Sequence, residues 1–250
     1  MIQLDNVSFT FQGDTENEVR AISDLNLKIN HGEFVTIVGA NGSGKSTLLN
    51  LLSGTLTPKP GRIIFEGTDV TSLKEFERSK WISRLFQNPL LGTASELSIL
   101  ENFRLAALRT RKKGLHIGTG KTFRDKVKNE LSFLQLGLET KLDQNIGKLS
   151  GGQRQALTLL MGVMDEAKIL LLDEPTAALD PKTSEIFMAM AERLIRERKL
   201  TTVFVTHHMK DAVKYGTRII QLEEGRILRD IQGDKKSNLT LNELFSWFGD

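Results

Sequence analysis

Residues 39–46 (GANGSGKS) have the composition and spacing of a loop that binds phosphate. An apolar run precedes them and a leucine-rich stretch follows, which is the strand-to-helix setting that this motif requires. Backbone N–H groups in such a loop, together with the dipole of the following helix, favour bound anions. The Lys45 ammonium would reach the β and γ phosphates of a nucleotide, and the Ser46 hydroxyl would bind Mg²⁺. The nucleotide contacts expected from this loop are Gly39, Asn41, Gly42, Ser43, Gly44, Lys45, Ser46 and Thr47.

Two adjacent carboxylates, Asp173 and Glu174, directly follow the apolar run 169–172. Acids at the carboxyl end of a strand lie at the edge where open α/β sheets bind ligands. We expect Asp173 to hold Mg²⁺, directly or through water, and Glu174 to polarise the water that attacks the γ-phosphorus. Such a pair is usually only solvated, but the phosphate-binding loop upstream favours the catalytic interpretation.

Residues 149–153 (LSGGQ) form a third motif. Ser150 is a predicted helix N-cap, and the N–H groups and paired glycines that follow it make a second site for an anion. The pentapeptide is similar to the signature sequence of ATP-binding cassette ATPases, and the chain resembles that family over nearly its whole length. The resemblance implies that each ATP lies between the loop of one chain and the signature of another, so that hydrolysis requires a head-to-tail dimer. The contacts implied for the second chain are Ser150, Gly151, Gly152, Gln153 and Asp180.

The same resemblance assigns further residues by their position. It implies that Phe11 stacks on adenine, and that Gln87 contacts Mg²⁺ and the attacking water and relays the nucleotide state to a membrane partner. His207 would contact the γ-phosphate and hold Glu174 in place, and residues 177–180 would cross the dimer interface. Each assignment is weak alone, because a single Phe is usually core and a His after a strand is more often structural; their order along one chain favours the functional interpretation. The expected catalytic residues are Glu174, His207 and Gln87, and the expected metal contacts are Ser46, Gln87 and Asp173.

The chain departs from the family pattern at a few positions. Ala156 stands where an arginine is usual, and residues 159–162 replace a small alanine-arginine-alanine segment. These changes affect helix packing behind the signature but leave the nucleotide chemistry untouched. His208 stands where an acid or amide is more common. The register after residues 205–206 favours His207 over His208 as the γ-phosphate contact.

Alternating strands and helices, after a strand-rich start, are predicted to position these residues. A buried strand at 34–38 leads into the phosphate-binding loop, and the helix at 45–53 stops at Gly54. Asp180 is a plausible N-cap for a helix at 181–198, with proline at its first position. The other predicted strands are 25–29, 62–66, 169–172, 203–205 and 218–222. The pattern is helical from about 88 to 165, and this region includes a predicted helix at 123–136 that stops at Gly137.

Strand, helix and strand in that order imply a parallel sheet. The expected fold class is therefore α/β: the resemblance implies a P-loop NTPase core with a mostly parallel sheet, an N-terminal antiparallel β subdomain and an inserted α-helical subdomain. Residues 1–250 would form a single ATP-binding cassette ATPase domain. Within it, residues 1–87 and 166–250 would be the nucleotide-binding core, and residues 88–165 the helical subdomain that carries the signature.

Composition limits the class of protein further. The chain has 250 residues, 39% of them hydrophobic and 26% charged, which is typical of a globular protein with ample material for a core. It has no cysteine, so neither a disulfide framework nor a thiolate site is expected, in agreement with a cytoplasmic location. No secretory signal and no apolar run long enough to span a bilayer are expected. Another polypeptide would have to cross any membrane involved.

Positive charge gathers in residues 104–128, which contain nine Lys or Arg and one acid, Asp125. The stretch has a single aromatic residue, Phe123, so it lacks the stacking platforms that nucleic-acid binding needs. No nucleic-acid partner is expected. A solvated helical face is favoured over contact with anionic lipid headgroups, although a polybasic segment near a membrane is attracted to them.

The resemblance favours an importer ATPase at the cytoplasmic face of the membrane. The chain lacks a fused membrane domain, residues 144–148 lack the glutamate of many exporters, and residues 176–180 differ from the Gly-Asn variant of lipoprotein-releasing and macrolide-type exporters. Residues 92–93 and 159–164 are similar to a subgroup that takes up amino-acid-like solutes, aromatic ones among them. The implied partners are a second copy of the chain, an integral-membrane permease whose coupling helix would dock on residues 92–108, and a substrate-binding protein.

Two alternatives remain open for a chain with these motifs. A soluble assembly factor, such as the cassette ATPase of iron-sulfur cluster biogenesis, has similar length and needs no membrane. A DNA-repair or translation ATPase is disfavoured, because the chain has neither a coiled-coil insertion nor a tandem cassette. Co-purification with a multi-spanning permease would support the importer, and co-purification with soluble scaffold proteins would support the assembly factor.

Overall fold

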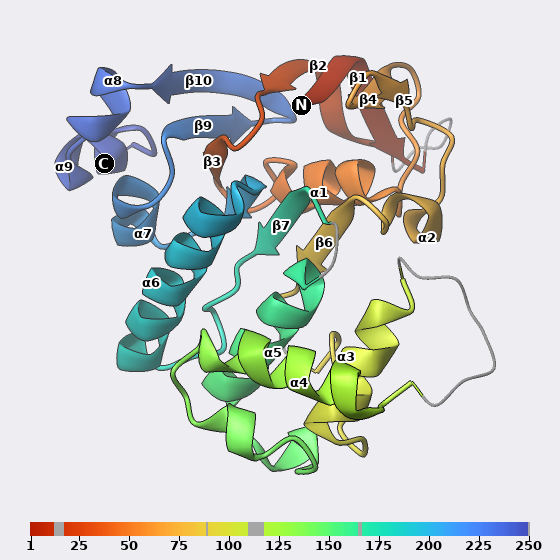
Figure 1. Ribbon diagram of the computed structural model, residues 1–250. Coiled ribbons are helices and arrows are strands. Elements are labelled where there is room, and N and C mark those ends of the chain that lie inside the picture. The colour runs from red at the N-terminus through yellow and green to blue at the C-terminus, as the bar shows by residue number, and fades with distance from the viewer. Residues whose placement is uncertain (13–17, 89, 110–117, 165–166, 250) are drawn as a thin grey trace.

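The computed structural model describes residues 1–12, 18–88, 90–109, 118–164 and 167–249. Its strands form two sheets, which lie together in the upper half of Figure 1. The smaller sheet has four strands in the order β2-β1-β4-β5, all antiparallel. Its strands are β1 (Ile2–Phe11), β2 (Val19–Ile29), β4 (Arg62–Phe65) and β5 (Thr68–Asp69).

The larger sheet has six strands in the order β10-β9-β3-β8-β7-β6. These are β3 (Phe34–Val38), β6 (Ile82–Leu85), β7 (Ile169–Asp173), β8 (Thr201–Val205), β9 (Arg218–Glu223) and β10 (Arg226–Gln232). All neighbours are parallel except β10, which pairs antiparallel with β9. β8 lies between β3 and β7, so the phosphate-binding loop, the two acids and His207 all follow adjacent strands at one edge of the sheet.

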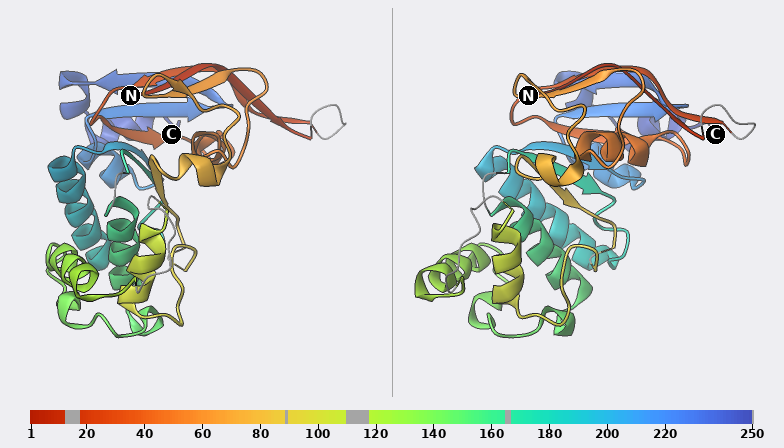
Figure 2. Two further views of the ribbon diagram at one scale, coloured as in Figure 1. Left: turned by 45° about the vertical axis from the view of Figure 1, so that its right-hand side comes forward. Right: turned by 90° about the vertical axis from the view of Figure 1, so that its right-hand side faces the viewer.

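The helices divide between the sheets and a separate helical part. α3 (Ile99–Ala107), α4 (Lys121–Ser132) and α5 (Gly151–Val163) form this helical part, which lies below the sheets in Figure 1. α3 and α4 project away from the sheets, and α5 leads back to β6 and β7 (Figures 1 and 2). The short 3₁₀ helices η1 (Leu138–Thr140) and η2 (Ile146–Lys148) lie between α4 and α5 in the chain. The remaining helices are α1 (Lys45–Ser53), α2 (Glu75–Arg78), α6 (Pro181–Arg198), α7 (Met209–Lys214), α8 (Asp234–Ser237) and α9 (Leu241–Ser246). No helix among the described residues is both long and apolar enough to cross a bilayer.

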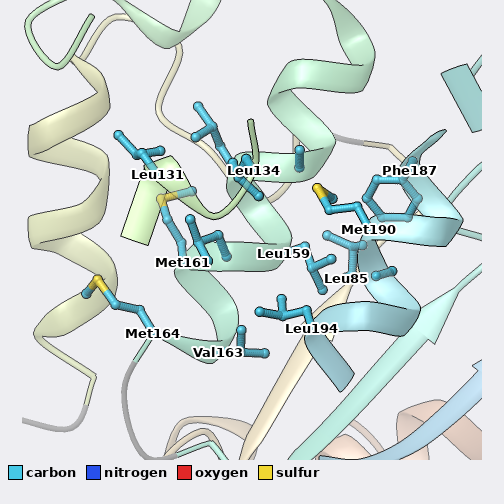
Figure 3. Close-up of a cluster of buried hydrophobic side chains, with 14 of the residues drawn as sticks. Leu85, Leu131, Leu134, Leu159, Met161, Val163, Met164, Phe187, Met190 and Leu194 are labelled. Carbon is cyan, nitrogen blue, oxygen red and sulfur yellow. The ribbon is translucent and has the colours of Figure 1, made fainter. Parts of the chain in front are cut away.

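The six-stranded sheet separates two apolar cores. In β7, Ile169 and Leu171 face the core around α1 and the antiparallel sheet, whereas Leu170 and Leu172 face the core shared with α5 and α6. Burial on both faces explains why this strand is a continuous apolar run rather than an alternating one. Figure 3 shows the second core, where Leu131, Leu134, Leu159, Met161, Phe187, Met190 and Leu194 converge from α4, the turn after it, α5 and α6.

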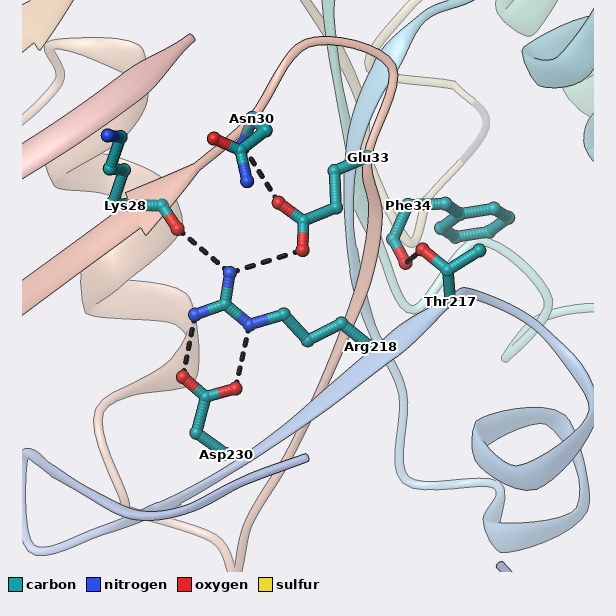
Figure 4. Close-up of polar contacts among 7 residues, drawn as sticks. All are labelled: Lys28, Asn30, Glu33, Phe34, Thr217, Arg218 and Asp230. Atoms are coloured by element: carbon teal, nitrogen blue, oxygen red, sulfur yellow. Dashed lines mark hydrogen bonds and ion pairs between the residues drawn. The ribbon is translucent and has the colours of Figure 1, made fainter. Parts of the chain in front are cut away.

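Arg218 of β9 joins the two sheets (Figure 4). Its guanidinium donates two hydrogen bonds to the Asp230 carboxylate on β10, of 2.7 and 2.6 Å, and one of 2.8 Å to the carbonyl oxygen of Lys28 on β2. The Glu33 carboxylate lies 3.2 Å from the same group. These two acids raise the pKa of Arg218 further above its ordinary value. The two-point contact with Asp230 is directional and fixes the guanidinium on the larger sheet, from which Nη1 holds β2 through Lys28 O.

The observed elements agree with most of the predicted ones but differ at several boundaries. The helix predicted at 123–136 is α4, which begins at Lys121 and ends at Ser132. The prediction was wrong at its end because residues 133–135 tighten into turns, with amides bonded to the carbonyl three residues earlier, and Gln135 takes a left-handed φ of 55°. Leu134 is buried all the same, so its helical spacing reflected burial and not helix. Residues 110–117 of the basic stretch lie outside the described residues.

Candidate nucleotide site

The phosphate-binding loop follows a backbone path that favours glycine. Gly42 and Gly44 have φ of 82° and 101°, in the left-handed region. A Cβ at Gly44 would lie 2.5 Å from the carbonyl oxygen of Ala21, and a Cβ at Gly39 would lie 2.4 Å from both Leu222 O and Ser43 Oγ. The loop is therefore packed between β2 and β9, and α1 begins immediately after it at Lys45.

Lys45 and Ser43 are polar groups held inside this loop. The Lys45 ammonium donates hydrogen bonds of 2.8 Å to the carbonyl oxygens of Gly39 and Ala40. Burial lowers the pKa of Lys45, while the carboxylates of Glu174 and Asp173 act in the opposite direction. The Ser43 hydroxyl is buried and has no hydrogen-bond partner among the described residues. An orphaned donor and a desolvated ammonium beside free helix N–H groups fit phosphate oxygens.

The two acids end β7 in different environments. Asp173 Oδ2 accepts a 2.7 Å hydrogen bond from Arg84 Nη2, and both side chains are largely buried. Glu174 has a left-handed φ of 46°, and its amide donates to Val205 O on β8. Its Oε2 lies 3.0 Å from Nδ1 of His207, which follows β8. The adjacency of β7 and β8 thus brings this carboxylate and imidazole together from positions far apart in sequence.

The two consecutive histidines differ in what they contact. His207 meets Glu174, and its ring is half exposed, so a ligand can reach it. His208 donates its backbone amide to Thr206 Oγ1 and forms the N-cap of α7. The rings lie 4.3 Å apart between centroids. This geometry agrees with the choice of His207 over His208, while its contact with a γ-phosphate stays a prediction.

Gln87 lies exposed in the segment after β6. A buried glutamine far away in the sequence, which sequence reasoning missed, contacts the residue before it. Gln155, in the second turn of α5, donates to Phe86 O at 3.1 Å and to Pro175 O at 2.9 Å. It therefore links the segment before Gln87 to the segment after Glu174. Sequence alone gave no signal for Gln155, because an amide on an amphipathic helix is usually solvated.

The signature segment begins α5 with a reciprocal cap. Ser150 Oγ accepts from the Gln153 amide, and Gln153 Oε1 accepts from the Ser150 amide, at 3.3 and 3.2 Å. The predicted N-cap at Ser150 is confirmed. Gly152 packs against Thr183, since a Cβ there would lie 2.3 Å from its methyl group. α5 belongs to the helical part, whereas α1 lies against the sheets (Figures 1 and 2).

Asp180 directly precedes α6, and Phe11 is the last residue of β1. Asp180 caps α6, as predicted, by accepting a 3.0 Å hydrogen bond from the Thr183 amide, and hydrogen bonding to Thr183 lowers the pKa of its carboxyl. Phe11 ends β1 with 42% of its surface exposed, and meets Phe9 edge to face with ring centroids 4.9 Å apart. An exposed ring held by a neighbour is available for stacking on a flat ligand.

The oxygen donors near the loop suit Mg²⁺. The described residues contain no cluster of three or more His, Cys, Asp or Glu that could enclose a metal ion. Mg²⁺ does not need one, because it is usually held by one or two carboxylates together with substrate phosphates and water. Ser46 at the start of α1, Asp173 at the end of β7 and the Gln87 amide offer that kind of donor set.

Comparison with known proteins gives a consistent result. A family model described as ABC transporter matches residues 22–177. The tyrosine transport ATP-binding protein of Clostridioides difficile is 40% identical, over 99% of this chain and 98% of its own. The phosphonates import ATP-binding protein PhnC 3 of Halalkalibacterium halodurans is 31% identical, over 98% of this chain and 94% of its own. A solved dimeric ATP-binding cassette in a post-hydrolysis state with ADP and Pi is 32% identical with a TM-score of 0.78, covering 93% of this chain and 98% of that one.

Proposed function

Because the chain belongs to the ATP-binding cassette (ABC) transporter family and is an ATPase of that class, we propose that it works as a head-to-tail dimer that powers solute import through a separate permease. The resemblance and the α/β fold class expected from the sequence are confirmed. The observation that carries the catalytic part of the proposal is the 3.0 Å contact between Glu174 and His207, at the sheet edge that also bears the phosphate-binding loop.

The residues at this edge divide the work of hydrolysis. Glu174 polarises the attacking water, and His207 fixes the orientation of its carboxylate. Lys45 exchanges the carbonyl oxygens of its own loop for phosphate oxygens, so its charge is already desolvated when the nucleotide arrives. When Mg²⁺ is bound by Ser46, Asp173 and Gln87, it supplies charge neutralisation on the phosphates. Phe11 stacks on the adenine.

The signature segment is proposed to complete the site of a second copy. In one chain the start of α5 lies in the helical part and α1 lies against the sheets (Figure 1), which supports a nucleotide site shared between two copies. The free N–H groups at the capped start of α5 suit the γ-phosphate of the opposite chain. The contacts proposed across the interface are Ser150, Gly151, Gly152, Gln153 and Asp180. Support comes from the dimeric form of a similar solved cassette.

We propose that the permease docks in a groove on the helical part. A cavity of about 500 Å³ lies between β6, α3 and α5, and exposed Leu91 and Leu105 lie on its rim. The helical subdomain, residues 88–165, would move against the core, residues 1–87 and 166–250, as the nucleotide state changes. The chain would then act at the cytoplasmic face of the membrane, with a substrate-binding protein delivering solute on the other side.

For the solute, we propose an amino acid or a related compound, aromatic ones included. Support comes from the relative named for tyrosine transport, which covers almost the whole chain. The similar proteins named for transport favour this role over that of a soluble assembly factor.

The test is the direction of transport in proteoliposomes that contain the chain, its permease and the binding protein. With ATP sealed inside and labelled tyrosine and binding protein outside, an importer accumulates label in the lumen, on the side that holds ATP and the cassette. Movement of label away from the ATP side would contradict import. Recovery of only soluble scaffold proteins with the tagged chain, and of no permease, would favour the assembly factor instead.

A further inference from the structure

Arg84 contacts three segments of the proposed nucleotide site. Its Nη2 donates to Asp173 Oδ2 on β7, and its Nη1 donates to Asn50 Oδ1 on α1, each at 2.7 Å. Its guanidinium carbon lies 4.8 Å from the centre of the Phe86 ring, directly before Gln87. None of the motifs discussed above includes this arginine. It lies on β6, opposite Leu171 of β7, with its side chain only 11% exposed.

The buried guanidinium of Arg84 does not have all of its hydrogen bonds satisfied. Arg84 Nε is buried and has no hydrogen-bond partner among the described residues. Burying an arginine–carboxylate pair costs desolvation free energy, and an unsatisfied N–H adds to that cost. Apolar groups in place of the whole pair would fill this space without the penalty, whereas removal of Arg84 alone leaves the Asp173 carboxylate without its partner. The arginine is therefore poorly explained as a device for stability alone.

Asp173 is left with one oxygen for another cation. Arg84 takes Oδ2, and within the described part of the chain no hydrogen bond reaches Oδ1. A metal ion at Oδ1 would share the carboxylate with the guanidinium, and the two side chains are only 11% and 17% exposed, so solvent screens the two positive charges less than it would at the surface. The two cations would share one carboxylate, and each would weaken the hold of the other.

We propose that Arg84 is a resident counter-cation for Asp173, a positioning residue that holds the carboxylate against α1 and sets how much Mg²⁺ the nucleotide site requires. Without nucleotide, Arg84 balances the charge of the acid and fixes its position through Asn50. With nucleotide and metal present, the guanidinium weakens the attraction of Asp173 for Mg²⁺. The inference rests on the proposed function, because it takes Asp173 as a metal contact.

The test compares Arg84→Met, which removes the charge, with Arg84→Lys, which keeps it. Binding of a fluorescent ATP analogue is titrated with Mg²⁺ at fixed nucleotide, and metal-free binding is measured in parallel. Loss of a positive charge beside the metal should lower the half-saturating Mg²⁺ concentration of Arg84→Met roughly 5-fold, because a like charge disfavours the cation. Arg84→Lys should stay within about 2-fold of the wild-type value, because its charge remains.

Arg198→Met is the matched control. Arg198 forms a part-buried pair with Glu130 and donates at 2.7 Å to Val163 O, far from the acids at the end of β7. Its loss should lower the melting temperature without moving the Mg²⁺ midpoint, since it removes an ion pair but no charge near the nucleotide.

An Arg84→Met midpoint equal to or above that of the wild type would overturn the proposal, whatever the change in stability. So would an equal shift in Arg198→Met. If the wild-type chain bound the ATP analogue with no Mg²⁺ dependence at all, the proposed function itself would fail, which is a distinct result.

Discussion

The Lys45 ammonium donates hydrogen bonds to two carbonyl oxygens of its own loop, those of Gly39 and Ala40. The loop thus pre-organises the charge that it offers to phosphate. A bound nucleotide has to replace those two hydrogen bonds, and charge-assisted bonds to phosphate are stronger than bonds to neutral carbonyls.

Replacing this lysine should affect nucleotide binding and turnover together. We expect Lys45→Ala to weaken ATP binding roughly 10-fold or more and to lower hydrolysis as well, since its charge contacts phosphate in the ground state and in the transition state. The measurements are equilibrium binding of a fluorescent ATP analogue and phosphate release. Lys236→Ala is the control, because Lys236 is also a buried lysine with a lowered pKa and a carbonyl partner, Val213 O. Unchanged binding in Lys45→Ala would remove the lysine from the phosphate site.

Glu174 differs from Lys45 in acting on water, so its loss should separate binding from chemistry. We expect Glu174→Gln to keep ATP binding and to lower turnover by about 100-fold or more, because the amide keeps the shape but not the basicity. ATP should then accumulate in a dimer, which size-exclusion chromatography with ATP and Mg²⁺ would detect.

Glu224→Gln is the control for this change. Glu224 shares the left-handed φ of 46° but lies exposed in the turn between β9 and β10. Hydrolysis near the wild-type rate in Glu174→Gln would exclude Glu174 as the base.

At this scale the sequence predicted the residues of short motifs and missed the residues that support them. Lys45, Asp173 and Glu174 could be proposed from the sequence because their chemistry is local to one loop or one strand end, and their roles stay predictions. Arg84 was missed because its partners, Asn50 and Asp173, are 34 and 89 positions away, and only the strand order β7-β6 brings them together. Because β6 has no distinct pattern of apolar residues, nothing in the sequence singles out this arginine.

Among the elements, α5 combines a structural and a proposed chemical role at its first turn. Ser150 and Gln153 cap each other, which leaves the remaining N–H groups of that turn directed at solvent or at a ligand. The cap uses only the amides of Ser150 and Gln153, so the other N–H groups of the turn stay available to the proposed anion.

A bulky cation at this cap should interfere with a second chain and not with the first. We expect Ser150→Arg to bind ATP as a monomer with wild-type affinity, and to lose dimer formation and at least about 10-fold in hydrolysis, because it blocks the site of the opposite copy. It should also lose about 1 kcal/mol of stability with the cap. The measurements are analytical ultracentrifugation and phosphate release.

Thr240→Arg controls for the loss of a cap, since Thr240 and Glu243 form the same reciprocal box at the start of α9. Wild-type turnover and dimer formation in Ser150→Arg would contradict the two-chain site.

Element boundaries were predictable where glycine and capping residues mark them. α1 runs from Lys45 to Ser53 and α6 from Pro181 to Arg198, as the cap and stop residues predicted. β6 and β10 were not predicted. β6 has four residues, two of them polar, and β10 is mostly exposed because it is an edge strand, so neither has a distinct pattern of apolar residues.

For the whole molecule, the connection between nucleotide and permease is proposed to run through the segment at Gln87. That segment follows β6, leads toward α3, and is tied through Phe86 O to Gln155 of α5. The segment therefore joins the core to the helical part twice, through the chain that leads to α3 and through the hydrogen bond from Gln155 to Phe86 O. A movement of the backbone near Asp173 and Glu174 would therefore displace the groove where the permease is proposed to dock.

We expect Gln87→Ala to lower transport more than it lowers the basal ATPase activity of the isolated chain. The excess loss should be roughly 5-fold or more, the scale of a typical coupling free energy between two sites. Transport and the hydrolysis that accompanies it are measured with the permease in proteoliposomes. Basal hydrolysis is measured on the isolated chain. Gln232→Ala, on the exposed edge strand β10, is the control. Transport and hydrolysis that decline in equal proportion would show that Gln87 serves only the attacking water.

The position of β7 between two apolar cores has a consequence for how the molecule opens. Alternate residues of this one strand are buried in each core, so unfolding either core would expose half of β7 and disturb the acids at its end. The helical part and the sheets should therefore unfold together and not as independent foldons. Hydrogen exchange should then show the amides of β7 and β8 exchanging with solvent in a single cooperative event. Any rotation of the helical part that hydrolysis drives must then occur in the segments that connect it to the core. The strand that bears the acids would stay folded throughout the cycle.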